Sequence, residues 1–96
     1  MCHSYRILIF CPTWELLYDK CLKIYEKLRD LDISNVEILH SVYLEYLKFL
    51  NIQDLTIRLP QIVIIIDSTV FRFLRDDIDT NDVDTIVNKI LSLVKC

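Results

Sequence analysis

Residues 57–66 read Ile-Arg-Leu-Pro-Gln-Ile-Val-Ile-Ile-Ile, and this stretch decides the fold class. Its second half, residues 62–66, is an unbroken run of β-branched apolar residues, which is typical of a strand buried on both faces of a sheet. Pro60 stands just before that run, where its missing backbone N–H does not interrupt the strand. The stretch therefore predicts a central sheet strand.

Three further strands are expected around this one. Residues 5–10 and residues 36–40 are short runs of mainly β-branched, leucine and aromatic residues, each bounded by turn-forming residues. A turn at 67–69 follows the central strand. Residues 70–74 are then apolar except for Arg72, whose side chain is expected to point to the other face, as in the partner strand of a hairpin.

Three helices are expected between and after the strands. The first begins at Trp14 with Thr13 as its N-cap, because apolar residues recur from there with the three-four spacing of one helix face. A second helix is expected over 41–50. Thr80 or Asn81 caps the last helix, whose apolar stripe lies at positions 83, 86, 87, 90, 91 and 94.

The predicted order is β-α-β-α-β-β-α within one domain over residues 1–96. Such an order belongs to the α/β class and predicts a four-stranded mixed sheet, with a right-handed βαβ crossover and helices on both faces. The same order is found in the thioredoxin fold, so the chain resembles that superfamily in topology.

Composition excludes several classes of function. The 96 residues carry a net charge of -3, so we expect no nucleic-acid partner. No apolar run approaches the roughly 18 residues of a membrane span, and no signal peptide is visible, so we expect a cytoplasmic protein that does not bind membranes.

The chain has no glycine and is rich in residues with A- and T-rich codons, which favours an AT-rich source such as a virus. Left-handed backbone positions must therefore be filled by Asn, Asp or Ser.

The segment at 57–64 is similar to the glutaredoxin segment in which a proline, cis in that family, precedes the third strand. The resemblance implies that the Leu59–Pro60 bond is cis. It also implies that the backbone N–H and C=O of Leu59 hold glutathione or an extended peptide, as a short piece of strand addition. An ordinary trans proline that opens a strand is the alternative.

Glutaredoxins carry a C-P-x-C dithiol at the start of the first helix, and this chain lacks it in either possible register. If Cys11 is taken as the nucleophile, Lys20 occupies one of the first-helix positions that glutaredoxins bury. If Glu15 stands at the nucleophile's position, they all fall on the apolar stripe, at Tyr18, Cys21, Ile24, Tyr25 and Leu28. The second register is favoured, and it places Cys11 in the preceding loop with an ordinary thiol pKa.

The remaining candidate residues have simpler interpretations. Residues 75–82 replace the glycine-containing glutathione segment of the family and read as an acidic, solvated loop. The helix terminus at Thr80 and Asn81 could bind an anion, although the aspartates around it oppose this. Cys21 is expected to be a core residue. Helix geometry places it about 15 Å from Cys11, beyond the about 7 Å that a disulfide allows.

Two functions remain open from the sequence. The first is a redox-inert, glutaredoxin-like module without cofactor or metal, which binds a protein partner or extended peptide segment. Its candidate binding residues are Trp14, Glu15, Tyr18, Leu59, Pro60, Thr80 and Asn81. The second is a monothiol thiol-disulfide oxidoreductase, in which Cys11 is catalytic and glutathione is a possible cofactor.

Overall fold

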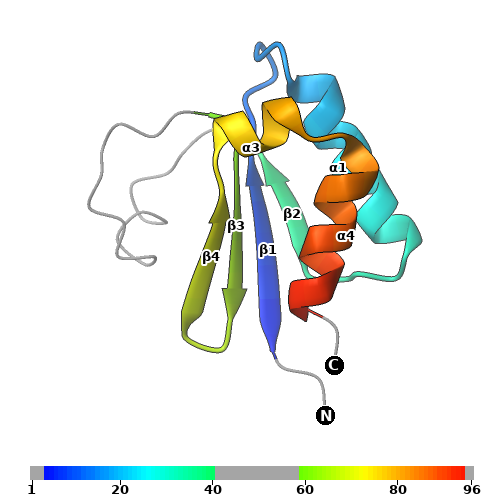
Figure 1. The fold of residues 1–96 in the computed structure, drawn as a ribbon, viewed down its shortest axis with the longest axis vertical. Coiled ribbons are helices and arrows are strands. Elements are labelled where there is room, and N and C mark those ends of the chain that lie inside the picture. Colours follow the sequence, from blue (N-terminus) through cyan, green and yellow to red (C-terminus); the bar gives the residue numbers. More distant parts are fainter. Residues whose placement is uncertain (1–3, 41–58, 95–96) are drawn as a thin grey trace.

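The computed structural model describes residues 4–40 and 59–94. Within these ranges the chain forms four strands and three helices (Figure 1). In chain order the elements are β1 (Tyr5–Phe10), α1 (Tyr18–Asp30), β2 (Val36–Leu39), β3 (Gln61–Ile66), β4 (Thr69–Phe73), α3 (Arg75–Thr80) and α4 (Val83–Val94).

The four strands form one mixed sheet in the order β2-β1-β3-β4. β1 pairs in parallel with β2 and antiparallel with β3, and β3 and β4 form an antiparallel hairpin. The α/β class, the mixed sheet and all four predicted strands are confirmed. The helix expected over 41–50 lies outside the described residues.

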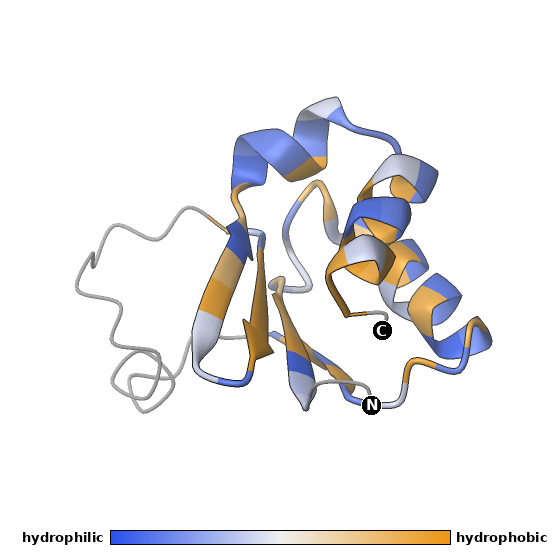
Figure 2. Cartoon of the chain, turned by 60° about the horizontal axis from the view of Figure 1, so that its bottom comes forward, coloured by the Kyte–Doolittle hydropathy of each residue, from blue (hydrophilic) through white to orange (hydrophobic). Residues whose placement is uncertain are grey.

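The main core lies between one face of the sheet and the helices α1 and α4. Alternate residues of β1 and β3 point to this face, and both helices turn their apolar stripes toward it (Figure 2). Wholly buried members include Ile7, Ile64, Ile24 and Ile90. A second, smaller cluster contains the residues of opposite parity, Leu8, Phe10 and Val63. Burial on both faces explains why β3 reads as an unbroken apolar run. None of the helices in the described part of the chain has the length and apolarity to cross a bilayer.

The first helix begins four residues later than predicted. Its N-cap position is Leu17 rather than Thr13, and no side chain bonds to the exposed N–H groups there. The preceding residues form turns, in which Glu15 N donates to Pro12 O at 3.1 Å and Tyr18 N donates to Glu15 O at 3.0 Å. Successive i→i+3 turns keep a nearly helical spacing of side chains, so the apolar pattern does not reveal where the α-helix starts.

The acidic segment after β4 is a short helix, α3, rather than the expected loop. Its N-terminus is held by a hydrogen bond from Leu74 N to Asp77 Oδ2 at 3.0 Å. Ile78 is the one apolar residue within α3, and it is completely buried in the main core. A single buried side chain in a six-residue helix leaves too little periodicity for a sequence pattern to detect.

The cap of the last helix is Asp82, not Thr80 or Asn81. Asp82 Oδ1 accepts a hydrogen bond from Thr85 N at 2.7 Å. This contact with Thr85 lowers the pKa of the Asp82 carboxyl. Thr80 and Asn81 instead donate to backbone carbonyls of α3, namely those of Asp76 and Asp77, at 2.7 Å each.

Among the residues that the structure describes, aspartate fills the left-handed positions of this glycine-free chain, as predicted. Asp32 has a φ of 62° and Asp67 has a φ of 54°. Asp32 follows α1 in a Schellman motif, in which Ile33 N donates to Leu28 O at 3.0 Å. Asp67 opens the turn of the β3–β4 hairpin.

Replacing Ile64 by alanine should strongly destabilise the fold, because Ile64 is wholly buried between β1 and β4. The expected loss in free energy of unfolding is about 2–5 kcal/mol, measured by urea denaturation. Val70→Ala on the exposed side of β4 is the control and should cost less than about 1 kcal/mol. Equal losses for the two variants would contradict the assignment of the core.

Candidate functional site

The ends of three strands meet at one end of the sheet. Phe10, the last residue of β1, pairs with both Leu39 at the end of β2 and Gln61 at the start of β3. The loop before α1 and the segment before β3 therefore lie at the same end, and α3 lies there as well (Figure 1). Chain segments far apart in the sequence are thus brought together at this end of the sheet.

The Leu59–Pro60 peptide bond is cis, which confirms the prediction. Pro60 is buried, while Leu59 is half-buried against the smaller cluster formed by Leu8, Phe10 and Val63. The backbone of Leu59 therefore lies directly before β3, at the end of the sheet where β1 finishes.

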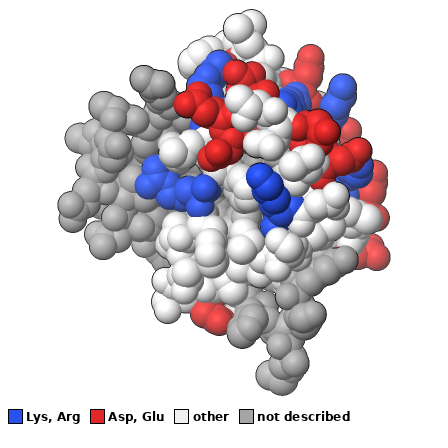
Figure 3. Space-filling model, viewed as in Figure 1, with Lys and Arg blue, Asp and Glu red and all other residues white. Residues whose placement is uncertain are grey.

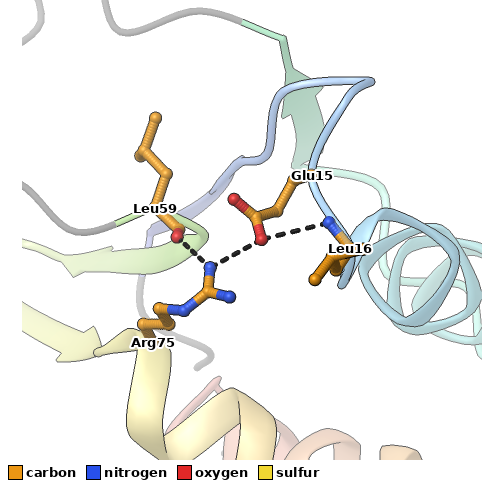
Figure 4. A network of polar contacts seen from close by, with 4 residues as sticks. All are labelled: Glu15, Leu16, Leu59 and Arg75. Atoms are coloured by element: carbon orange, nitrogen blue, oxygen red, sulfur yellow. Dashed lines mark hydrogen bonds and ion pairs between the residues drawn. The ribbon is translucent and has the colours of Figure 1, made fainter.

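Arg75 joins three of these segments through one guanidinium nitrogen. Its Nη1 donates to Glu15 Oε1 at 2.7 Å and to the backbone oxygen of Leu59 at 2.5 Å (Figure 4). The same Glu15 oxygen accepts a hydrogen bond from Leu16 N at 3.1 Å. The Glu15 side chain is only 9% exposed and that of Arg75 is 30% exposed. Glu15 raises the pKa of Arg75 further, so the guanidinium remains a cation.

This network changes the expected chemistry of the Leu59 edge. The resemblance implies that the Leu59 carbonyl is available to a bound segment, but here the carbonyl accepts a hydrogen bond from Arg75. A bound segment must therefore share that carbonyl with Arg75 or displace the guanidinium. No sequence pattern indicates this role of Arg75, because the contact depends on how α3 folds.

Two large apolar side chains are exposed on either side of Glu15. Trp14 is 78% exposed and Leu16 is 92% exposed. Trp14 was predicted as a binding residue, whereas Leu16 was missed. The sequence feature that could have indicated Leu16 is that this leucine lies outside the apolar stripe of the first helix and so is not expected in the core.

Cys11 and Cys21 are both wholly buried members of the main core. The predicted separation of about 15 Å assumed a continuous helix from Trp14, whereas the structure has turns before α1, which begins at Tyr18. As predicted, Cys21 is a core residue.

The two thiols have opposite pKa shifts. The hydrogen bond from Cys21 lowers the pKa of Cys11, and the positive charge of Arg75 acts in the same direction, against burial and the charge of Glu15. The same hydrogen bond, together with burial, raises the pKa of Cys21. The expectation of an ordinary pKa for Cys11 was therefore wrong.

The other predicted site residues divide into two groups. Tyr18 is the first residue of α1, and its ring lies 5.8 Å from that of His40, which follows β2. His40 Nδ1 lies 3.3 Å from the backbone oxygen of Cys11, so both rings border the site end of the sheet. Thr80 and Asn81 lie beyond, at the end of α3, with their side chains engaged by that helix.

Among residues 4–40 and 59–94, no group of three or more histidine, cysteine or acidic side chains is arranged to hold a metal ion. An open pocket of about 360 Å³ lies at the opposite end of the sheet, where Tyr5, Asn35 and Asp67 contribute to its lining. That pocket contains none of the candidate residues.

Removing the Arg75 side chain should destabilise the protein, because it leaves the nearly buried Glu15 carboxylate without its cation. We expect Arg75→Ala to lower the urea midpoint clearly more than Arg72→Ala. Arg72 is a matched control because it is an exposed arginine on β4. The interpretation is wrong if both variants have the same midpoint.

Comparison with protein-family models, with curated proteins and with solved structures gives no match. The main features of this end of the sheet are the Glu15–Arg75 pair, the Leu59 backbone, the exposed Trp14 and the buried thiol of Cys11.

Proposed function

We propose that the chain is a glutaredoxin-like domain of the thioredoxin fold that lacks the dithiol site and binds an extended protein segment at the Leu59–Pro60 edge. One observation carries the proposal. Glu15 occupies the position at which the favoured register places the nucleophilic cysteine of glutaredoxins, and it is paired with Arg75, which also donates to the backbone oxygen of Leu59. The edge is therefore accompanied by a fixed ion pair rather than by a reactive thiol.

The arrangement of the strands supports the fold assignment. A parallel β1–α1–β2 unit is followed by the β3–β4 hairpin and a terminal helix, α4. The predicted buried positions in the favoured register also agree with it, because Cys21, Ile24 and Leu28 are buried in α1. Tyr18 and Tyr25 pack against the same core.

The chemistry of the available side chains argues against an oxidoreductase. Exchange of a disulfide needs a thiolate that can reach one sulfur in line with the other. Glu15 has no sulfur, and the Cys11 thiol, although its pKa is lowered, is wholly buried. Burial disfavours the alternative function, a monothiol reaction with glutathione through Cys11.

The exposed apolar residues favour a protein partner. Leaving a tryptophan and a leucine in water forgoes the roughly 25 cal/mol per Å² that burial of apolar surface provides. Trp14 and Leu16 can recover this when a partner covers them, and tryptophan is among the residues enriched at binding hot spots. A partner that pairs with the backbone near Leu59 would be held by main-chain hydrogen bonds and by these two anchors.

Binding can be followed through Trp14, which is the only tryptophan of the chain. Peptides selected on the full-length protein from a random display library should shift Trp14 fluorescence to shorter wavelength as they cover the side chain. Leu16→Ala should weaken their binding about tenfold, as expected when one apolar anchor worth about 1.4 kcal/mol is lost.

Leu31→Ala is the matched control, because Leu31 is an exposed leucine that follows the other end of α1. It should leave the affinity unchanged. Selected peptides that bind without any change in Trp14 fluorescence, and equally well to both variants, would exclude this edge as the binding site.

The assignment of Glu15 leads to a second expectation. The wild-type protein should be nearly inactive in a glutathione-coupled disulfide reduction assay, and Cys11→Ser should not alter this. The double variant Glu15→Cys/Tyr18→Cys should gain measurable turnover, because Arg75 would then favour the thiolate at position 15. Robust wild-type turnover that Cys11→Ser abolishes would show instead that Cys11 is the nucleophile.

A further inference from the structure

The outer strand β4 has an edge that the proposed function does not use. β4 is the last strand in the order β2-β1-β3-β4, and within the part of the chain that the structure describes its partner strand is β3 alone. Its residues pair one to one with those of β3, so the strand is regular, and it contains no proline or lysine. Such an edge presents unpaired backbone N–H and C=O groups to another strand.

The pairing pattern shows which backbone groups of β4 point outward. Asp67, directly after β3, donates its N–H to Ser4 O, directly before β1. Backbone groups alternate sides along a strand, so odd-numbered residues of β3 bond to β1 and even-numbered ones bond to β4. Phe71 pairs with an even-numbered residue and bonds inward to β3. Val70 and Arg72, on either side of Phe71, therefore turn their N–H and C=O groups away from β3.

The open edge ends where α3 begins. Leu74 is the next outward position after Arg72, and its N–H donates to Asp77 Oδ2 at 3.0 Å. Its carbonyl oxygen accepts a hydrogen bond from Ile78 N at 3.1 Å. Both backbone groups of Leu74 are thus engaged by α3, and the outward positions of β4 itself are Val70 and Arg72.

We propose that β4 pairs with β4 of a second copy of this chain, antiparallel about a twofold axis at Phe71. In that register Val70 lies opposite the partner's Arg72, and Arg72 lies opposite the partner's Val70. Each of these pairs exchanges both of its backbone hydrogen bonds. Every outward N–H and C=O group of the two β4 strands then has a partner, and the two four-stranded sheets become one continuous sheet. The surface lies apart from the Leu59–Pro60 edge and does not depend on the function proposed for it.

The side chains of β4 are complementary to themselves in this register. Phe71 is 37% exposed and Val70 is 38% exposed, and the middle of β4 is hydrophobic at the edge of the sheet (Figure 2). On the twofold axis, Phe71 meets the partner's Phe71 in a non-hydrogen-bonded pair, the kind that brings side chains closest. Aromatic pairs across strands stabilise a sheet. Val70 is covered on the other face by the stem of the partner's Arg72.

The distribution of charge favours β4 over the other edge strand. In Figure 3 the acidic side chains gather toward the end that holds α3, and few charged side chains lie over the β3–β4 hairpin. β2 has only four residues, and among them is Glu37, which is paired with Arg6 at 3.2 Å. A charged side chain on a short strand is typical of an edge that does not accept another strand.

Two features limit the strength of the dimer. β4 has only five residues, so the interface is small and belongs to the weak, reversible class. Arg72 and the partner's Arg72 are diagonal neighbours on one face, where their like charges repel. The dimer therefore forms at high protein concentration and dissociates on dilution.

Sedimentation equilibrium of the full chain tests the proposal. The average mass of wild type should rise with concentration from 11.5 kDa toward twice that value. Val70→Pro removes an outward N–H that makes no bond to β3, so it should leave the urea midpoint nearly unchanged but weaken the dimer at least tenfold. Arg72→Thr removes the repulsion between the two arginines and should strengthen the dimer.

Two further variants separate pairing through β4 from association elsewhere. Phe71→Lys places like charges directly opposite each other on the axis and should also abolish the dimer, which keeps the test decisive if Val70→Pro does not fold. Leu31→Lys is the control, because it changes an exposed apolar residue after α1, and it should dimerise as wild type does. A wild type that stays monomeric at millimolar concentration overturns the proposal. So does a dimer that folded Val70→Pro and Phe71→Lys form as strongly as wild type.

Discussion

The antiparallel pairing of β1 with β3 is the constraint on which the rest of the structure depends. Six residue pairs, from Tyr5 with Ile66 to Phe10 with Gln61, fix the two central strands against each other. Because β1 also pairs in parallel with β2, the register decides which chain ends gather at the same end of the sheet. A shift by one residue would move the buried residues of β3 to the wrong face and would separate Leu59 from Glu15.

Long apolar runs made the sheet predictable, whereas short polar elements did not. The bounds of all four described strands were predicted to within a residue or two, since each strand is a β-branched or aromatic run between turn residues. The stripe of α4 was also clear. α3 was missed because only Ile78 ties it to the core, and the start of α1 was misplaced because turns and helix share a spacing of side chains.

The candidate site was predictable only where it depends on local pattern. Glu15 was assigned to its position from the buried stripe of α1, and Pro60 from the segment around it. The role of Arg75 was not predictable, because it depends on where α3, which is distant in sequence from Glu15, places the guanidinium. The prediction of the cap of α4 was wrong for a related reason. Thr80, Asn81 and Asp82 are all good capping residues, and the geometry of α3 selects Asp82.

The two left-handed aspartates lie at the end of the sheet opposite the site. Asp67 N donates to Ser4 O at 3.0 Å, beside the start of β1, and Asp32 follows α1 just before the chain enters β2. Both occupy conformations that a non-glycine residue adopts at a cost. The strained backbone positions are therefore located away from the Leu59–Pro60 edge. Substitutions at Asp32 and Asp67 can change the stability of the fold without altering any residue of the proposed binding edge.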